Sequence, residues 1–322
     1  MQQRSYYHKL LLNRIRPHVD PLLRNNQNGF RSGRSTLSQI LALRRILEEA
    51  RNFNLDAVLV FVDFKKAFDS VDRDKMFDIL SLYGIPPKII KAIQLLYTDT
   101  KACVQTPDGD TDSFSILAGI LQGDTLAPFL FILVVDYIMR VSVDKISDCG
   151  FQLERKRGPR NPAVHITDTD FADDIALISS RIADAQKLLN SLESAANCIG
   201  LYLNELKTEF YTPNLTDPSV EIKTNSGNNL KRVNDYKYLG SYISSSEKDF
   251  KIRKALAWSA CNKLDKIWSS NLIDNNLKIK VFQTTIEPIL LYGSETWCLT
   301  KLLEKRLDGT YTRLLRRVKN LS

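Results

Sequence analysis

The sequence predicts an α+β fold in which helices back one antiparallel sheet in the split βαβ arrangement. The run "AVLVFVDF" is apolar without alternation, which indicates a strand buried on both faces. The segments "VHITDTD" and "DIALISS" are strand-like halves of one hairpin, and stretches of helical periodicity separate the strands. A length of 322 residues, 43% hydrophobic and 25% charged, suits one large globular domain or two smaller ones.

Helices and strands alternate in the first half of the chain. After "NGFRSGRST", apolar residues from Leu37 to Ala50 recur on one helical face. "DRDKMFDILSLYG" and "PPKIIKAIQLLYTD" predict two helices separated by Gly84 and a Pro-Pro pair. "KACVQTPDGDTDSFSILAG" contains an Asp-Gly turn typical of a hairpin. "TLAPFLFILVVDYIMRVSV" predicts a long apolar helix, with Pro128 in its first turn.

The second half begins with "RKRGPRNPA", a basic loop, and the predicted hairpin follows it. "RIADAQKLLNSLESAANCIG" predicts an amphipathic helix closed by Gly200. "LYLNELKTEFYT" and "VNDYKYLGSYIS" predict strands, and the chain from Phe250 onward is predicted to be helical and basic. We therefore expect a domain boundary at residue 250, with residues 1–250 and 251–322 as the two parts.

The positive charge lies at the two ends of the chain. The net charge is +8 and the pI is about 9.1, which favours a polyanionic partner. Residues 1–35 hold 7 basic and 1 acidic side chains, and residues 251–322 hold 14 and 6. Residues 36–250 hold 24 basic and 30 acidic side chains. This pattern fits an acidic metal-binding centre between surfaces that hold a phosphate backbone, although basic helices can also simply have solvated faces.

Cysteine usage and hydropathy indicate a soluble intracellular protein. The five cysteines include no C-x-x-C pair, which argues against a disulfide framework and a zinc site. The N-terminus lacks the apolar core of a signal peptide, so we expect no secretion. The longest apolar run, "APFLFILVVDYIM", is too short to span a bilayer, so we expect no membrane partner.

Three carboxylates are candidates for a metal site. Asp63 ends the buried strand, where an unpaired carboxylate is costly. Asp173 and Asp174 are neighbours at the predicted hairpin tip, which indicates either a solvated turn or a metal site. If the strand lies beside the hairpin, the three carboxylates could hold two Mg²⁺ ions about 3.5–4 Å apart, with Mn²⁺ as a possible substitute.

Six blocks, in order, resemble the reverse transcriptase domain of non-LTR (LINE-type) retrotransposons. They are "QNGFRSGRST", "FVDFKKAFDSVDR", "GILQGDTLAPFLF", "TDFADDIALIS", "GLYLNELKT" and "YKYLGSYIS". The tail, with "LLYGSETWCLTK" and "RLLRRV", is similar to the segment that follows this domain. The resemblance implies a right-hand polymerase palm with partial fingers in residues 1–250. Residues 251–322 would form a basic, thumb-like helical region.

The resemblance also implies roles for residues of the central blocks. Asp63, Asp173 and Asp174 would be the catalytic, metal-binding carboxylates, and the backbone at Phe64 would help to bind the second metal. Phe68 would lie under the sugar, where its ring would exclude a 2′-hydroxyl. Without the resemblance, the interpretation of Phe68 as a core aromatic residue would be favoured.

Further residues would bind the nucleotide. Gln122 and Gly123 resemble the loop that lines the nucleotide and template pocket, where glycine allows close approach of the backbone. Arg31 and Arg34 would grip the triphosphate through charge-assisted hydrogen bonds, although they could equally cap or solvate the following helix.

Two later blocks imply contacts with the leaving group and the primer. Lys207 would protonate the departing pyrophosphate, or would be an ordinary charge at the end of a strand. Tyr238, Leu239 and Gly240 resemble the turn that supports the primer end.

The resemblance implies an RNA-directed DNA polymerase whose partners are an RNA template, a DNA primer and deoxynucleoside triphosphates, with nuclear residence. The strand usually expected before "YYHKLLLNRI" is absent, which favours the alternative of an inactive, truncated polymerase-derived protein that binds RNA or RNA/DNA hybrid. A third alternative is an RNA-copying RNA polymerase, but such an enzyme would favour a small or polar residue in place of Phe68.

Overall fold

The computed structural model describes residues 2–107, 109–121, 123–154, 158, 160, 163–214, 217 and 219–320, with side chains from Tyr6 onward. Contacts divide the chain into two compact units. The first comprises Met1–Gln39 and Glu49–Asn234, and the second comprises Ile40–Glu48 and Asp235–Ser322. The second unit thus begins ahead of residue 251 and includes the middle of helix α2.

A five-stranded sheet forms the centre of the first unit, in the order β11-β10-β1-β9-β8. The bounds are β1 Val58–Val62, β8 Asp168–Phe171, β9 Asp174–Ser179, β10 Glu209–Tyr211 and β11 Lys231–Val233. β1 pairs antiparallel with β9 and β10, and β8 pairs antiparallel with β9, as predicted. The outer pair, β10 and β11, is parallel and departs from the prediction. Side-chain alternation has the same period in both pairings, so the sequence pattern does not distinguish them.

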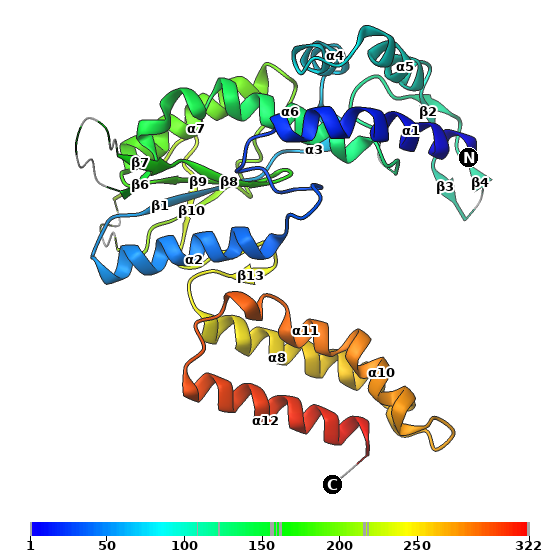
Figure 1. The fold of residues 1–322 in the computed structure, drawn as a ribbon, viewed down its shortest axis with the longest axis vertical. Helices are drawn as coiled ribbons and strands as arrows, with labels where there is room; N and C mark the ends of the chain where they lie inside the picture. Colours follow the sequence, from blue (N-terminus) through cyan, green and yellow to red (C-terminus); the bar gives the residue numbers. More distant parts are fainter. Residues whose placement is uncertain are drawn as a thin grey trace. The chain divides into compact units, whose positions relative to one another are not determined.

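Helices α6 (Ala127–Val141) and α7 (Ile182–Asn197) cover one face of this sheet (Figure 1). All five residues of β1 are buried, as the apolar run predicts. In α6 every residue from Phe129 to Val135 is buried, and Pro128 lies in the first turn, where its missing N–H costs nothing. One apolar core therefore holds β1 and β9 in a fixed register, which positions the residues at their ends.

The remaining helices of the first unit, which includes only the two ends of α2, are α1 Gln2–Val19, η1 Asp20–Leu22, α2 Thr36–Asn52, α3 Ala67–Ser70, α4 Arg73–Leu82, α5 Pro87–Tyr97 and η2 Asp144–Cys149. Short strands pair as three small hairpins: β2 Lys101–Ala102 with β5 Phe114–Ser115, β3 Gln105–Thr106 with β4 Gly109–Asp110, and β6 Phe151–Glu154 with β7 Val164–Ile166. β7 thus pairs with β6, and only the "DTDF" half of the predicted segment pairs with β9.

The second unit is a helical assembly with its own apolar core. Its elements are β12 Lys237–Tyr238, β13 Ser241–Tyr242, α8 Ser246–Lys263, α9 Asp265–Trp268, α10 Asn275–Thr285, α11 Glu287–Leu291, η3 Ser294–Thr296 and α12 Lys301–Val318. Phe250, Trp268, Phe282 and Trp297 are buried in this core. Within the described part of the chain, no helix combines the length and apolar character needed to cross a bilayer.

Candidate active site

The paired aspartates lie at a tight hairpin turn. Phe171 pairs with Asp174, so Ala172 and Asp173 form the two-residue connection between β8 and β9. Ala172 has a φ of 57°, in the left-handed region. Side chains alternate along a straight strand, so this turn is what brings two neighbouring carboxylates to the same end of the sheet.

The register of β1 brings Asp63 to the same end. Val62 pairs with Ile175, so Asp63 and Asp174 are the next residues beyond this pair. The Asp63 carboxylate accepts a hydrogen bond from Asn204 Nδ2 at 2.8 Å, and its backbone N–H donates to Thr208 Oγ1 at 3.2 Å. The "LNELKT" block therefore braces Asp63, a role that the sequence did not reveal.

The three carboxylates are coupled electrostatically. Burial, together with the charge on Asp63, raises the pKa of Asp173. Burial and the charges on Asp173 and Asp63 raise the pKa of Asp174 to about 6. Like charges held near one another retain protons unless a cation neutralises them, so this end of the sheet favours a cation.

The donor set fits a hard divalent cation, because carboxylate oxygens are the ligands that Mg²⁺ prefers. Among the described residues, however, no group of three or more Asp, Glu, His or Cys side chains is already placed to hold an ion. Mutual repulsion favours separated carboxylates, so their side chains would turn inward when a cation binds. Which residues ligate a metal remains a prediction.

The two predicted phenylalanines lie close after β1. Phe64 is buried in the main core, and its backbone forms an antiparallel bridge with Leu203. The Phe68 ring is half-buried and stacks on Phe131, with the ring centroids 4.1 Å apart. Phe68 therefore has the packing of a core aromatic on one face and retains some exposed surface.

The backbone of Phe68 is tied to the start of the "GILQGD" block. The Phe68 carbonyl accepts a hydrogen bond from Ile120 N at 2.7 Å. Gly123 is exposed, with a φ of 96°, whereas Gln122 lies outside the described residues. The predicted pocket loop is thus anchored at its beginning to the turn that carries Phe68.

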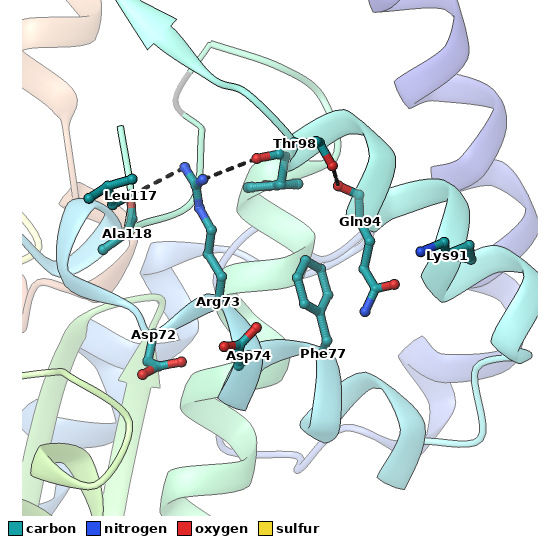
Figure 2. A pocket seen from close by; sticks show the side chains of 10 residues that line it. Asp72, Arg73, Asp74, Phe77, Lys91, Gln94, Thr98, Leu117 and Ala118 are labelled. Carbon is teal, nitrogen blue, oxygen red and sulfur yellow. Dashed lines mark hydrogen bonds between the residues drawn. The ribbon is translucent and has the colours of Figure 1, made fainter. Parts of the chain in front are cut away.

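Arg73 fastens the segment before that loop. Its guanidinium donates to the carbonyls of Tyr97, Ile116, Ala118 and Gly119 at 2.9–3.3 Å. Figure 2 shows the bond to Ala118 and the side chains that line the surrounding cavity. The volume of this cavity is about 450 Å³. Because these bonds occupy the guanidinium, we assign Arg73 to supporting the loop.

The two arginines of the first block lie in different environments. The Arg31 side chain is buried, forms an ion pair with Asp20 at 3.2 Å, and donates to the carbonyls of Arg24 and Gln27. The Arg34 side chain is exposed, and its guanidinium donates a hydrogen bond to Asn25 Oδ1 at 3.4 Å. These contacts favour the local, structural alternative for Arg31 and leave Arg34 accessible to a ligand.

Lys207 is exposed in the turn that follows Asn204, and its N–H donates to the Asn204 carbonyl at 3.1 Å. Since Asn204 holds Asp63, Lys207 and Asp63 are connected through one short segment. The predicted placement of Lys207 near the carboxylates is consistent with this connection and stays a prediction.

The predicted primer-supporting residues form a tight turn in the second unit. Leu239 and Gly240 connect β12 to β13 with φ values of 45° and 85°, as a type I′ turn requires, and Tyr238 is buried beside them. The Leu239 carbonyl accepts a hydrogen bond from the Tyr292 hydroxyl at 2.7 Å, and the Gly240 carbonyl accepts one from Arg253.

Asp249, which sequence analysis did not single out, organises the residues behind this turn. Its buried carboxylate accepts hydrogen bonds from Arg44 Nη2 at 3.2 Å and Trp297 Nε1 at 2.9 Å. It also accepts one from Ser241 Oγ, at the start of β13. A buried carboxylate with several donors holds the surrounding elements in one arrangement.

A second buried network lies under the β8–β9 hairpin. Arg24 forms ion pairs with Asp168 at 2.7 Å and Asp170 at 2.9 Å, and both carboxylates are fully buried. Burial would lower the pKa of Arg24, but these carboxylates hold it above its ordinary value. Burial and the charge on Asp168 raise the pKa of Asp170 well above its ordinary range.

A mixed sheet with carboxylates at one end and two helices on one face is the arrangement expected of the palm of a nucleotidyl-transferring polymerase. Residues 5–243 match the family of reverse transcriptases, or RNA-dependent DNA polymerases. The chain belongs to this family, and its relatives identify a non-LTR reverse transcriptase domain. Members of the family generally use divalent metal ions.

Relatives occur in several animals. The chain is 32% identical over 159 residues to a transposon-derived protein of Caenorhabditis elegans, covering 48% of this chain and 57% of that protein. It is 25% identical over 295 residues to a Pol polyprotein of the type-1 retrotransposable element R2 of Popillia japonica, covering 89% and 46%. The chain thus spans about half the length of these relatives.

Among solved structures, telomerase of Candida tropicalis truncated at its C-terminal domain matches with a TM-score of 0.48 at 14% identity. This match covers 74% of the present chain and 42% of the telomerase chain.

Proposed function

We propose that the chain is an RNA-directed DNA polymerase that extends a DNA primer along an RNA template. The observation that carries the proposal is the convergence of Asp63, Asp173 and Asp174 at one end of the sheet, with the pKa values of both hairpin aspartates raised. Family membership supports the same reaction.

We assign Asp63, Asp173 and Asp174 as the ligands of two Mg²⁺ ions, with the backbone at Phe64 contributing to the second ion. When bound, the ions supply a lowered pKa for the primer 3′-hydroxyl and stabilisation for the leaving pyrophosphate. The protein's own contribution is to hold the carboxylates. Asn204 and Thr208 fix Asp63, and the hairpin turn fixes Asp173.

The incoming deoxynucleoside triphosphate would lie against residues from four of the six sequence blocks. Arg34 is exposed and can bind phosphate oxygens by charge-assisted hydrogen bonds. Gly123, together with Gln122, would line the pocket, and Phe68 would exclude a 2′-hydroxyl. Lys207 would donate a proton to the departing pyrophosphate. The 238–240 turn would support the primer, and the basic helices after 250 would hold the hybrid through its phosphates.

Primer extension on poly(rA)/oligo(dT) with the purified chain tests the proposal. We expect Mg²⁺-dependent extension that EDTA abolishes and that the Asp173→Ala/Asp174→Ala variant lacks. Loss of metal-bound transition-state stabilisation should reduce the rate at least about 10³-fold. The matched control is Asp112→Asn, which changes an exposed aspartate elsewhere in the same unit.

Absence of extension by a folded parent chain would refute the polymerase proposal. Hybrid binding with a steep salt dependence, in that case, would identify a polymerase-derived binding protein instead. From family membership alone we infer that the chain acts in the nucleus, and microscopy of a fluorescently tagged chain tests this location.

A further inference from the structure

The side chain of Gln27 directly contacts the Ala172–Asp173 turn between β8 and β9. Gln27 is completely buried, and its Oε1 accepts hydrogen bonds from the N–H groups of Gly29 and Ala172, both at 2.8 Å. Its Nε2 donates to the Ala172 carbonyl at 3.3 Å. One neutral amide thus pairs with both polar groups of Ala172, as the backbone of an adjacent strand would.

This contact continues a short backbone pairing beside β8. Gln27 forms a parallel bridge with Asp170, Asn28 N donates to the Asp170 carbonyl at 2.9 Å, and Asp170 N donates to the Asn26 carbonyl at 3.1 Å. Backbone pairing ends where the hairpin turns. At Ala172 the hydrogen bonds come from the Gln27 side chain instead of the backbone, so the first block of the chain supports the hairpin up to its tip.

Ala172 needs such support. Its φ of 57° is unfavourable for a residue with a Cβ, and it is 2% exposed, so its N–H and carbonyl require partners within the protein. The backbone of Gly29 lies against it, and a Cβ on Gly29 would stand 2.3 Å from Ala172 N. Glycine at position 29 is what allows Gln27 to reach the turn.

We propose that Gln27 is a positioning residue that holds the Ala172–Asp173 turn so that the Asp173 carboxylate faces the metal. The inference rests on the proposed function for the identity of that metal. Repulsion between Asp173 and Asp63 works against this arrangement. The hydrogen bonds of the neutral Gln27 amide hold the turn against that repulsion without adding a charge. Partners that orient a metal ligand typically affect metal affinity or activity by about 10–100-fold.

Gln27→Met tests this role, because methionine approximates the shape of glutamine and removes all three hydrogen bonds. Gln39→Met is the matched control. Gln39 is also buried, and its Nε2 donates to the carbonyls of Asn26 and Asp170 at 2.8 and 3.1 Å, but it does not bond Ala172. Gly29→Ala keeps the Gln27 side chain but places a Cβ against Ala172 N, which separates Gln27 from the turn. It serves as the second variant if Gln27→Met does not fold.

Two readouts separate positioning from general stability. Amide hydrogen exchange at Ala172 should accelerate at least about 10-fold in Gln27→Met and stay within twofold of the parent in Gln39→Met. In primer extension, Gln27→Met should raise the half-saturating Mg²⁺ concentration and lower kcat, each about 10-fold or more, with KM for the deoxynucleotide unchanged.

Parent-like exchange at Ala172 in Gln27→Met, or equal effects of the two methionine variants on Mg²⁺ dependence, would overturn the inference. Failure of the proposed function has a different signature, since the parent chain would then extend no primer. In that case two measurements still decide whether Gln27 holds the turn for a cation. One is amide hydrogen exchange at Ala172, and the other is the rise in melting temperature that Mg²⁺ causes in the parent compared with Gln27→Met.

Discussion

Replacing Asp173 by Asn should stabilise the metal-free protein. The pKa of Asp174 is raised from 3.8 to about 6 by burial, by Asp173 and by Asp63. At 1.36 kcal/mol per pKa unit, this displacement corresponds to about 3 kcal/mol of unfolding free energy. The Asp174 carboxylate is only partly covered, so solvent screens its interactions, and Asp173 is one of three causes of the shift. We therefore expect Asp173→Asn to gain about 1 kcal/mol at pH 8.

The pH dependence has a defined sign. A carboxyl whose pKa is higher in the folded state than in the unfolded state binds protons preferentially on folding. The parent should lose stability as pH rises from about 3.8 to 6, and the full penalty should persist above pH 6. Asp173→Asn should show a smaller loss over this interval.

Mg²⁺ should reverse the order of the two proteins. At a Mg²⁺ concentration 100 times the dissociation constant, binding stabilises the parent by about 2.7 kcal/mol. A variant whose affinity is 100-fold lower gains about 0.4 kcal/mol under the same conditions. The variant should thus be the more stable protein in EDTA and the less stable one in Mg²⁺.

Urea unfolding followed by far-ultraviolet circular dichroism measures the stability of the parent and of Asp173→Asn in EDTA and in Mg²⁺. Hydrogen exchange of the β1 and β9 amides assigns the difference to the first unit. Tryptophan fluorescence does not serve, because all three tryptophans lie after residue 250. Asp112→Asn should match the parent in both solutions. An Asp173→Asn protein less stable than the parent in EDTA at pH 8, or one that Mg²⁺ stabilises equally, would refute the electrostatic reasoning.

Three further predictions concern residues around the site. Phe68→Ala should admit ribonucleotides at least about 10-fold better in primer extension and cost about 1–2 kcal/mol, since its half-buried ring stacks on Phe131. Phe77→Ala, another half-buried aromatic change, should leave the choice between ribonucleotides and deoxynucleotides unaltered. If both variants discriminated between the two nucleotides equally well, Phe68 would not be the residue that excludes the 2′-hydroxyl. Arg24→Met should lower the free energy of unfolding, followed by circular dichroism, by about 3–5 kcal/mol, because it leaves Asp168 and Asp170 buried without their cation. A loss below about 1 kcal/mol would show that these carboxyls become protonated instead of remaining charged. Asp249→Asn should destabilise the second unit by about 3 kcal/mol in tryptophan-fluorescence unfolding, because Arg44 loses its buried partner; the exposed change Asp308→Asn should be neutral, and equal effects would argue against the network.

The sequence predicts the parts of the site that depend on strand patterns. The apolar run of β1 predicts a buried strand ending at Asp63, and the hairpin pattern predicts a tip at the paired aspartates. Contacts between distant segments have no such local signal. Gln27 stands in "NNQNGF", a composition typical of a loop, and only its partner Ala172 makes its amide a buried group.

Arg31 shows the same limit from the opposite side. An arginine in a basic block is consistent with phosphate binding and with local support, and its sequence context does not separate the two. Its contacts with Asp20 and with the Arg24 and Gln27 carbonyls come from the way the chain folds back after α1. Those contacts occupy the guanidinium, so tertiary structure favours local support over phosphate binding for Arg31.

Four aspartates stand close together in "TDTDFADD", and their environments divide them into two pairs. Strand alternation places Asp168 and Asp170 on one face of β8, where both are buried and paired with Arg24. The turn at Ala172 then brings Asp173 and Asp174 together at the tip, where burial and mutual repulsion raise their pKa values. The base of the hairpin is therefore compensated by a resident cation, and the tip would be compensated by a bound one. This difference is why removing Arg24 should destabilise the protein, whereas removing the Asp173 charge should stabilise it until a divalent cation binds.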